Sequence, residues 1–298
     1  MTAPLAHPMP DSPHTAEIGA MLAALREASA VVRDLYDRAA AATYEKSDGS
    51  PVTDADLASA RIIRAILGER FPADAILTEE GRDDPARLAS PRCWIVDPID
   101  GTQQFVDRTG DFDVLMALAV DGRPVIAGSM QPPTGVICLA AAGAGAWIDA
   151  GAGWRRVTFG GGDRRPVVAT SHWFGAPENL DLVADIAHAL SGDLARTTDI
   201  GLTPRQFLEG DAVDVLLGFR LGAGQFMAHE WDAATADLFL AEAGGLVTDL
   251  HGRIPRYNRP EPHLDRGLVV ANSRELHAAA LRETRRRLEA AGLGEAGR

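Results

Sequence analysis

The chain has 298 residues, 46% of them hydrophobic, and a formal net charge of −13 at pH 7. This length suffices for one large domain or two ordinary ones around a buried core. The acidic balance argues against nucleic acid polymers as partners, because neutralising their phosphates needs clustered Lys and Arg. No apolar run approaches the roughly 20 residues of a membrane span. We therefore expect a cytoplasmic protein that binds neither membranes nor nucleic acid.

Residues 1–15 contain four prolines but no basic start and no apolar core, so they do not form a signal peptide. We predict a disordered tail there. The two cysteines, Cys93 and Cys138, have no partners at metal-ligand spacing. Both are expected to be buried, reduced thiols.

Two helices are predicted near the N-terminus. Apolar residues recur at helical spacing from Ile18 to Leu35, after a helix start at Ser12-Pro13, and predict a helix that runs to about residue 42. A polar, turn-rich stretch follows over 46–56. Within it, Thr53 is a good N-cap and Asp56 stands at the capping-box position of a second helix, which ends near residue 72.

The next segments read as strands. Residues 75–78 form a short strand candidate that stops at Glu79-Glu80-Gly81, and the apolar run 94–96 ends at Asp97. Beyond Phe105, four apolar segments separated by Gly or Pro predict an antiparallel meander over 113–120, 125–130, 135–141 and 146–148. This meander would be the sheet of an N-terminal α+β lobe spanning 16–160, which would also carry the metal site.

The stretch 160–163, Gly-Gly-Gly-Asp, is the best linker candidate. After it the pattern changes to alternating strands and helices, which predicts a C-terminal α/β lobe over 165–292. Its expected strands are 166–170, 212–218, 246–249 and 267–271. Its expected helices are 180–190, 232–243 and a last one capped by Ser273.

Two acids follow the apolar run that ends at residue 96. Asp97 and Asp100 stand where the chain should leave the interior, and carboxylates so placed repel one another unless a cation or proton intervenes. With the Ile99 carbonyl they supply the hard oxygen ligands that magnesium prefers. The backbone N–H groups of Gly101 and Thr102 fall at a helix start, which favours anions. A metal and a phosphate would meet here.

Other acids are candidates for the same site. Asp232 opens a helix of the second lobe, and Glu79 ends the neighbouring strand; each alone is also an ordinary surface or helix-start acid. Two divalent ions about 4 Å apart would clamp the attacking and leaving oxygens of a phosphoryl group and acidify a bound water. Thr102, paired with Asp56, could orient that water.

Several separated motifs occur in an order that resembles the inositol monophosphatase superfamily over residues 15–290. The motifs are Asp97-Pro98-Ile99-Asp100-Gly101-Thr102, Glu79-Glu80, Trp231-Asp232-Ala233-Ala234 with 242–245, and 50–56. The resemblance implies an α+β or α/β architecture, a layered αβαβα sandwich of the inositol monophosphatase and fructose-1,6-bisphosphatase type. It also implies magnesium dependence, lithium inhibition and a homodimer.

The resemblance further implies roles for single residues and two or three Mg²⁺ ions per site. One metal would be held by Glu79, Asp97, Thr102 and the Ile99 carbonyl. The second would be held by Asp97, Asp100 and Asp232. The catalytic group would comprise Glu79, Asp56 and Thr102. The amides of Gly101 and Thr102 would receive the phosphate, with no covalent phosphoenzyme.

Substrate identity is a separate question. The segments 108–114, 230–232 and 256–260 look more like the 3'(2'),5'-bisphosphate nucleotidase branch than like inositol phosphatases, which usually carry a glutamate where Gln225 stands. The stretch 201–205 resembles the segment that contacts the second phosphate in that branch. It makes Thr203 and Arg205 substrate-binding candidates, with Arg220 a weaker one. His229 would line the pocket rather than ligate metal.

The sequence thus predicts a Mg²⁺-dependent phosphomonoesterase that hydrolyses a small phosphorylated metabolite, above all a bisphosphate nucleotide such as 3'-phosphoadenosine 5'-phosphate. Inositol 1-phosphate, another sugar or cyclitol phosphate, or histidinol phosphate is the alternative substrate. A non-catalytic metabolite-binding protein with the same fold is the alternative of another class. Such a protein would be expected to have lost a ligand, and none is missing.

Overall fold

The computed structural model describes residues 7–46, 49–160, 164–175, 179–195, 202–208, 213–219 and 228–291. The helices are α1 Thr15–Asp37, α2 Asp54–Arg70, α3 Thr102–Val106, α4 Leu180–Ala189, α5 Glu230–Ala243 and α6 Arg274–Ala290. The first sheet contains β3 Ala75–Thr78, β4 Arg92–Asp100, β5 Asp113–Val120, β6 Arg123–Met130, β7 Ile137–Ala141, β8 Gly145–Asp149 and β9 Arg155–Val157, in that order. The second sheet has the order β11 Asp193–Leu194, β10 Val167–Gly175, β12 Val215–Phe219, β16 Leu268–Ala271 and β14 Leu246–Thr248.

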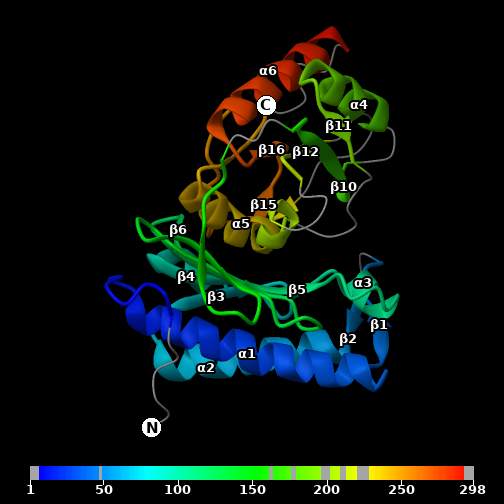
Figure 1. Ribbon diagram of the computed structural model, residues 1–298. Helices are drawn as coiled ribbons and strands as arrows, with labels where there is room; N and C mark the ends of the chain where they lie inside the picture. The colour runs from blue at the N-terminus through cyan, green and yellow to red at the C-terminus, as the bar shows by residue number, and fades with distance from the viewer. Residues whose placement is uncertain are drawn as a thin grey trace.

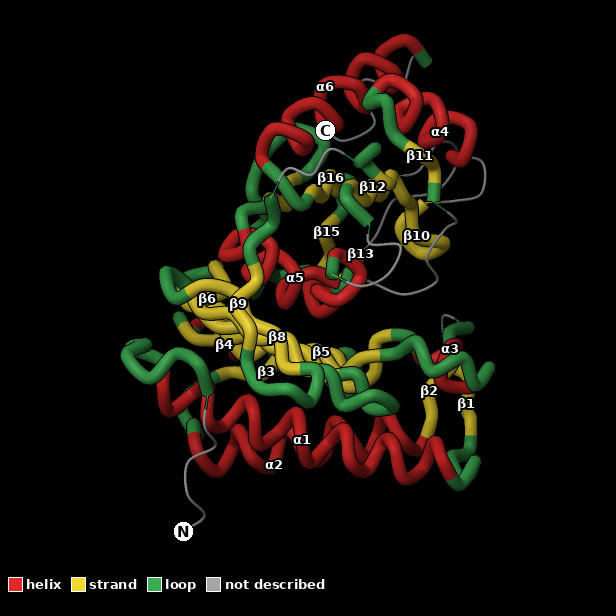
Figure 2. Tube along the Cα trace, in the orientation of Figure 1, coloured by secondary structure: helices red, strands yellow, loops and turns green. Residues whose placement is uncertain are grey.

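These elements form five layers (Figure 1). Helices α1 and α2 cover one face of the seven-stranded sheet, and α5 covers the other. The five-stranded sheet lies beyond α5, with α4 and α6 on its far side (Figure 2). The predicted αβαβα sandwich is therefore confirmed.

Helix α5 is the middle layer and is apolar on nearly all sides. Ten of its fourteen residues are buried, as expected of a helix enclosed between two sheets. Its side chains join those of β4 to β8 and those of β10, β12 and β16 in one hydrophobic cluster. The sequence predicts this helix as part of the second lobe, but it packs on both sheets. The two lobes therefore share a core.

Strand β4 shows how the pleat directs side chains. Trp94 and Val96 pack toward α1 and α2, whereas Cys93 and Ile95 belong to the cluster around α5. Successive side chains of a strand alternate between faces, so Asp97 follows Cys93 and Ile95 onto the α5 side. Cys93 and Cys138 are buried thiols outside any disulfide, as predicted, and burial raises the pKa of Cys93 to about 12.

Several boundaries differ from the sequence predictions. The first helix ends at Asp37 rather than near 42, and Ala39 has a φ of 50° outside the helical region. The strands expected at 135–141 and 212–218 are Ile137–Ala141 and Val215–Phe219, while β10 is longer than 166–170. Two small two-stranded antiparallel sheets were not predicted: β1 Thr43–Glu45 with β2 Pro51–Thr53, and β13 Ala228–His229 with β15 His263–Leu264.

The N-terminal end of the first lobe differs in part from the predicted disordered tail. Of the predicted tail, residues 1–6 lie outside the described part, but Met9 is buried among the side chains of α1 and the first sheet. Burial of the apolar Met9 side chain stabilises the fold. The linker residues 161–163 also lie outside the described part. Among the described residues, no helix is both long and apolar enough to cross a membrane.

Candidate active site

Glu79 and Asp97 lie side by side because their strands are parallel. In the register of β3 and β4, Thr78 lies opposite Val96, and the Glu79 N–H donates to the Val96 carbonyl at 3.2 Å. The residues that follow are therefore neighbours at the same sheet edge. The two carboxyl groups are close enough that the charge of Glu79 adds to burial in raising the pKa of Asp97. Sequence reasoning expected both acids at strand ends, and the sheet brings them together.

The turn after Asp97 brings a third acid to this edge. The pairing of β4 with β5 shifts register between Asp97 and Asp100, and such irregularities re-aim side chains. The Asp97 carboxylate accepts the Ile99 N–H at 3.0 Å, and the Ser59 hydroxyl of α2 donates to the Pro98 carbonyl at 2.9 Å. These bonds fix the turn, so both aspartates stay at one end of the strand.

Thr102 and Asp56 form the pair that the sequence suggested. The Thr102 hydroxyl donates to Asp56 Oδ1 at 2.9 Å, and the Ile99 carbonyl lies 3.3 Å from the same hydroxyl. The other oxygen of Asp56 accepts from the N–H and hydroxyl of Thr53, which completes the predicted capping box. Gly101, just before α3, has a φ of +94°, a conformation that glycine adopts without strain.

Asp232 reaches the site from α5. It stands in the first turn of that helix, where its Oδ2 accepts the His229 N–H at 2.7 Å. Burial, and then the negative charges of Glu79, Asp100 and Asp232, raise the pKa of Asp97 well above its usual range. The other three acids are thus close enough to Asp97 to disfavour its ionisation. Asp232 both caps its helix and faces this cluster.

Lys46 was missed by sequence reasoning. Its ammonium lies 2.6 Å from Glu79 Oε1 and 2.6 Å from Glu80 Oε1. The charges of these two glutamates raise the pKa of Lys46 despite its burial. A signal was available in the composition: Lys46 is the only lysine among the 29 basic residues of the chain. Its position shows that this edge of the carboxylate cluster attracts a cation.

The donor atoms of this cluster are of the types that bind a divalent cation, but they are not already arranged around a metal position. The donors are carboxylate, carbonyl and hydroxyl oxygens, the ligands of Mg²⁺, and Lys46 already places a positive charge on one of them. Within the described ranges, however, no three acidic, His or Cys side chains already enclose a point that would hold a metal. Lys46 would have to leave Glu79 as an ion binds this carboxylate.

The predicted substrate-binding residues have mixed outcomes. Arg220 and Gln225 lie outside the described residues. Thr203 is fully buried, so its hydroxyl does not face solvent as a substrate contact would. Arg205 donates to Asp113 Oδ2 at 2.8 Å and also binds Asp111, so its charge is balanced by two carboxylates rather than left for a phosphate.

His229 stacks on the Trp231 ring, with centroids 4.5 Å apart and planes 5° apart, and meets His263 edge-on at 4.8 Å. Its ring Nδ1 lies 3.7 Å from Asp232 Oδ2. The ring therefore borders the carboxylate cluster, where the sequence placed it. Beside it, the Leu202 N–H donates to the Asp232 carbonyl at 3.2 Å, which ties the stretch after residue 201 to the start of α5.

A second feature that sequence reasoning missed holds the two lobes together beside the site. Arg87, in the short helical turn Pro85–Ala89, is buried and donates to the Asn258 side chain and the Arg259 carbonyl, each at 2.8 Å. Glu230, fully buried in α5, accepts the N–H groups of Asn258 and Arg259 at 2.6 and 2.9 Å. We call Arg87, Asn258 and Glu230 the interlobe clasp. It connects the loop after Glu79 with the helix that carries Asp232.

Comparisons with known proteins agree with this architecture. A model of the inositol monophosphatase family matches residues 15–289. The 3'(2'),5'-bisphosphate nucleotidase CysQ of Aggregatibacter actinomycetemcomitans is 30% identical over 251 residues, 82% of this chain and 88% of that protein. A histidinol-phosphatase of Chlorobaculum parvum is 30% identical over 256 residues, 80% of this chain and 88% of that protein. The crystal structure of CysQ from Bacteroides thetaiotaomicron has a TM-score of 0.72 at 26% identity, covering 86% of this chain and 97% of that one.

The layered fold and its carboxylate cluster, together with these relatives, define a phosphatase that acts on phosphomonoesters. Enzymes of this kind generally use divalent metal ions. The chain belongs to the inositol monophosphatase family.

Proposed function

We propose that the chain is a Mg²⁺-dependent phosphatase whose substrate is a small 3'(2'),5'-bisphosphate nucleotide. The observation that carries the chemistry is the convergence of Glu79, Asp97 and Asp100 from the first sheet with Asp232 from α5. The CysQ relatives, 30% and 31% identical over most of their length, support the nucleotide substrate. We expect two or three ions per site. The homodimer and lithium inhibition stay predictions from the family resemblance, and the cytoplasmic location stays a prediction from the composition.

When bound, the ions would polarise the phosphoryl group and acidify a water molecule. The Thr102 hydroxyl donates a hydrogen bond to Asp56. The lone pairs of its oxygen are therefore directed away from Asp56 and can accept a hydrogen bond from that water. This arrangement would hold the water in one orientation. The N–H groups of Gly101 and Thr102, at the start of α3, would hold the phosphate oxygens.

Histidinol phosphate is the second candidate substrate, because a histidinol-phosphatase matches the chain at the same 30% identity. The two candidates differ in what the second lobe must recognise. A bisphosphate nucleotide needs a cation for its second phosphate, and Arg205 is held by Asp111 and Asp113. That cation would have to be Arg205 after release from these acids, or Arg220.

The decisive experiment is a panel of kcat/KM values measured with purified protein and Mg²⁺. The panel contains 3'-phosphoadenosine 5'-phosphate, inositol 1-phosphate, histidinol phosphate and fructose 1,6-bisphosphate, each with and without lithium. We expect the bisphosphate nucleotide to be preferred, Asp97→Asn to abolish turnover, and the exposed control Asp107→Asn to retain it. Release of phosphate from none of the four would refute the proposed function, and a preference for histidinol phosphate would replace the nucleotide.

A further inference from the structure

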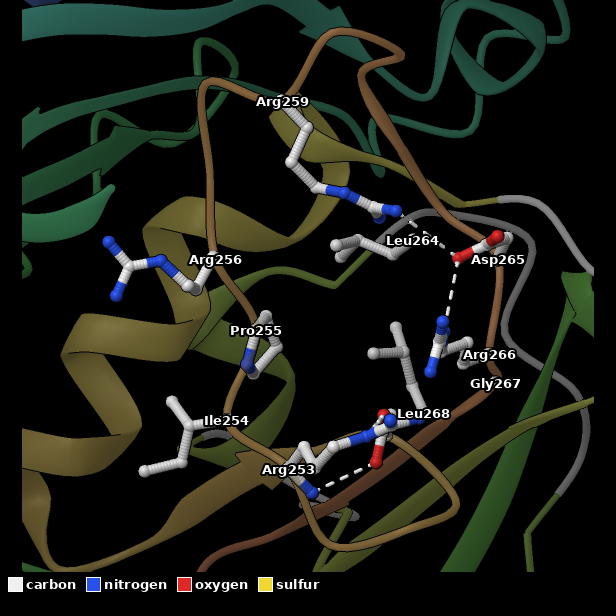
Figure 3. A pocket seen from close by; sticks show the side chains of 11 residues that line it. Arg253, Ile254, Pro255, Arg256, Arg259, Leu264, Asp265, Arg266, Gly267 and Leu268 are labelled. Atoms are coloured by element: carbon white, nitrogen blue, oxygen red, sulfur yellow. Dashed lines mark hydrogen bonds and ion pairs between the residues drawn. The ribbon is translucent and has the colours of Figure 1, made fainter. Parts of the chain in front are cut away.

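A cavity of about 250 Å³ opens in the second lobe, between the chain segment that follows β14 and the segment that leads into β16. Its walls come from residues 249–268, and Figure 3 shows them. None of the residues assigned above to metal, water or phosphate belongs to this lining. The cavity is therefore separate from the carboxylate cluster.

The lining is rich in arginine. It includes four arginines and two aspartates, and without Arg256 the excess is one positive charge in a chain whose net charge is −13. Arg256 points away from the cavity in Figure 3 and donates to the Asp121 carbonyl at 2.6 Å. Arg253, Arg259 and Arg266 remain at its wall. The local field thus favours an anion although the whole chain repels one.

The two aspartates differ in how many hydrogen bonds they accept. Asp249 accepts the N–H groups of His251 and Arg253 and the Arg253 Nε, all at 2.8 to 2.9 Å. Asp265 instead lies 3.5 Å from the guanidinium of Arg259 and 4.0 Å from that of Arg266. These distances are too long for hydrogen bonds. Within the described residues its buried Oδ1 accepts none.

The guanidinium groups of Arg259 and Arg266 thus both lie near the Asp265 carboxylate, and neither forms a hydrogen bond with it. Arg259 has a further partner in the His263 carbonyl, whereas the Arg266 guanidinium has only the 4.0 Å contact in the described chain, and its side chain is 42% exposed. Its planar fork matches a phosphate in two parallel hydrogen bonds. The donors of Arg266 are therefore available to an oxyanion, and Arg259 adds a second positive charge beside them.

We propose that this cavity binds a phosphate-class oxyanion, held by Arg266 together with Arg259, the two arginines beside Asp265. Ligand pockets for larger molecules usually measure about 300 to 1,000 Å³, so this cavity is too small for a nucleotide. It fits free phosphate, or a phosphate carried on a body of a few carbon atoms that would lie against Leu264 and Leu268, which also line it. The site would thus recognise a smaller molecule than the proposed substrate.

The test is calorimetric titration of metal-free protein at low ionic strength in chloride buffer, with inorganic phosphate and with glycerol 1-phosphate as probes. Without metal, the active-site carboxylates repel both probes, and no turnover is involved, so the result is independent of the proposed function. We expect saturable binding of one equivalent. Tighter binding of glycerol phosphate would indicate a carried phosphate, and equal or weaker binding would indicate the free ion.

Three variants decide whether the cavity is responsible. Arg266→Gln should weaken binding about tenfold, which corresponds to the loss of a charge-assisted pair. Asp265→Asn should tighten binding, because it removes the carboxylate that competes for the two arginines. Arg282→Gln, on the exposed surface of α6, removes the same charge elsewhere and should change nothing. Absence of saturable binding, or equal affinities of the wild type and Arg266→Gln, would overturn the proposal, as would equal weakening by Arg282→Gln.

Discussion

Lys46 gives the sharpest test of how the carboxylate cluster accepts a metal. Its ammonium lies 2.6 Å from an oxygen of Glu79 and 2.6 Å from an oxygen of Glu80. An ion that binds Glu79 must therefore displace it. Replacing Lys46 by Met removes this competitor while keeping the length of the side chain. We expect Lys46→Met to bind Mg²⁺ more tightly than the wild type.

The magnitude follows from the exposure of the three side chains, which is 20% for Lys46, 25% for Glu79 and 9% for Glu80. Ion pairs that solvent still reaches contribute about 0.5 to 1 kcal/mol each. Loss of both pairs on metal entry thus costs the wild type about 1 to 2 kcal/mol. The dissociation constant for Mg²⁺ should fall by roughly 5- to 30-fold in the variant.

Calorimetric titration of Mg²⁺ into metal-free protein measures this change, and Arg61→Met, an exposed arginine of α2, controls for the loss of one positive charge. The single lysine of the chain allows a second readout. Reductive methylation with ¹³C-formaldehyde labels only Lys46 and the N-terminal amine, and the Lys46 resonance should shift as Mg²⁺ is added. If Lys46→Met bound Mg²⁺ no more tightly than Arg61→Met, Lys46 would be no competitor.

Three further predictions concern stability. Asp97→Asn should unfold at higher urea concentration than the metal-free wild type at pH 7, because the raised pKa of Asp97 marks a carboxylate that destabilises the folded state; equal midpoints would contradict this. Arg87→Met should lower the free energy of unfolding by about 3 kcal/mol, since it leaves buried acceptors of the interlobe clasp without a donor; a loss below about 1 kcal/mol would show that the clasp is weak. Burial raises the pKa of Glu230 from 4.5 to about 7. As the pH rises, the unfolded chain loses the Glu230 proton before the folded chain does. Protonated Glu230 therefore makes its full contribution to the free energy of unfolding below pH 4.5, and about 3 kcal/mol of this free energy is lost as the pH rises through 7. Glu230→Gln should lack that loss in urea titrations across this range, and an unchanged profile would refute the assignment.

The sequence predicted those site features that depend on local pattern. An apolar run that ends in an acid is visible in one short window, and parallel pairing of two such strands brings Glu79 beside Asp97. The capping box of Thr53 and Asp56 is equally local. The order of the layers came from the family resemblance, because periodicity alone does not show which sheet a helix covers. Helix α5, which serves both sheets, is the clearest case.

Features that join distant segments were not predictable in this way. The resemblance of 201–205 to a phosphate-contacting segment makes Arg205 a phosphate ligand, but the side chain binds Asp111 and Asp113, about ninety residues upstream. Arg87 meets Asn258 across 171 positions, and neither residue stands in a pattern that marks it. Which partner a charged side chain binds depends on distances that are set by the packing of the fold. The sequence therefore shows the charge of the side chain but not the residue that it contacts.

The choice of lysine at residue 46 has a physical reason in the same cluster. The other 28 basic residues of the chain are arginines, whose rigid guanidinium fork binds a carboxylate in two hydrogen bonds. An ammonium is a compact charge on a flexible stem, so it can neutralise Glu79 and still withdraw when a divalent ion arrives. An arginine at this position would hold the carboxylate more firmly. Lys46→Arg should therefore weaken Mg²⁺ binding where Lys46→Met strengthens it, although Lys46→Arg leaves the net charge unchanged.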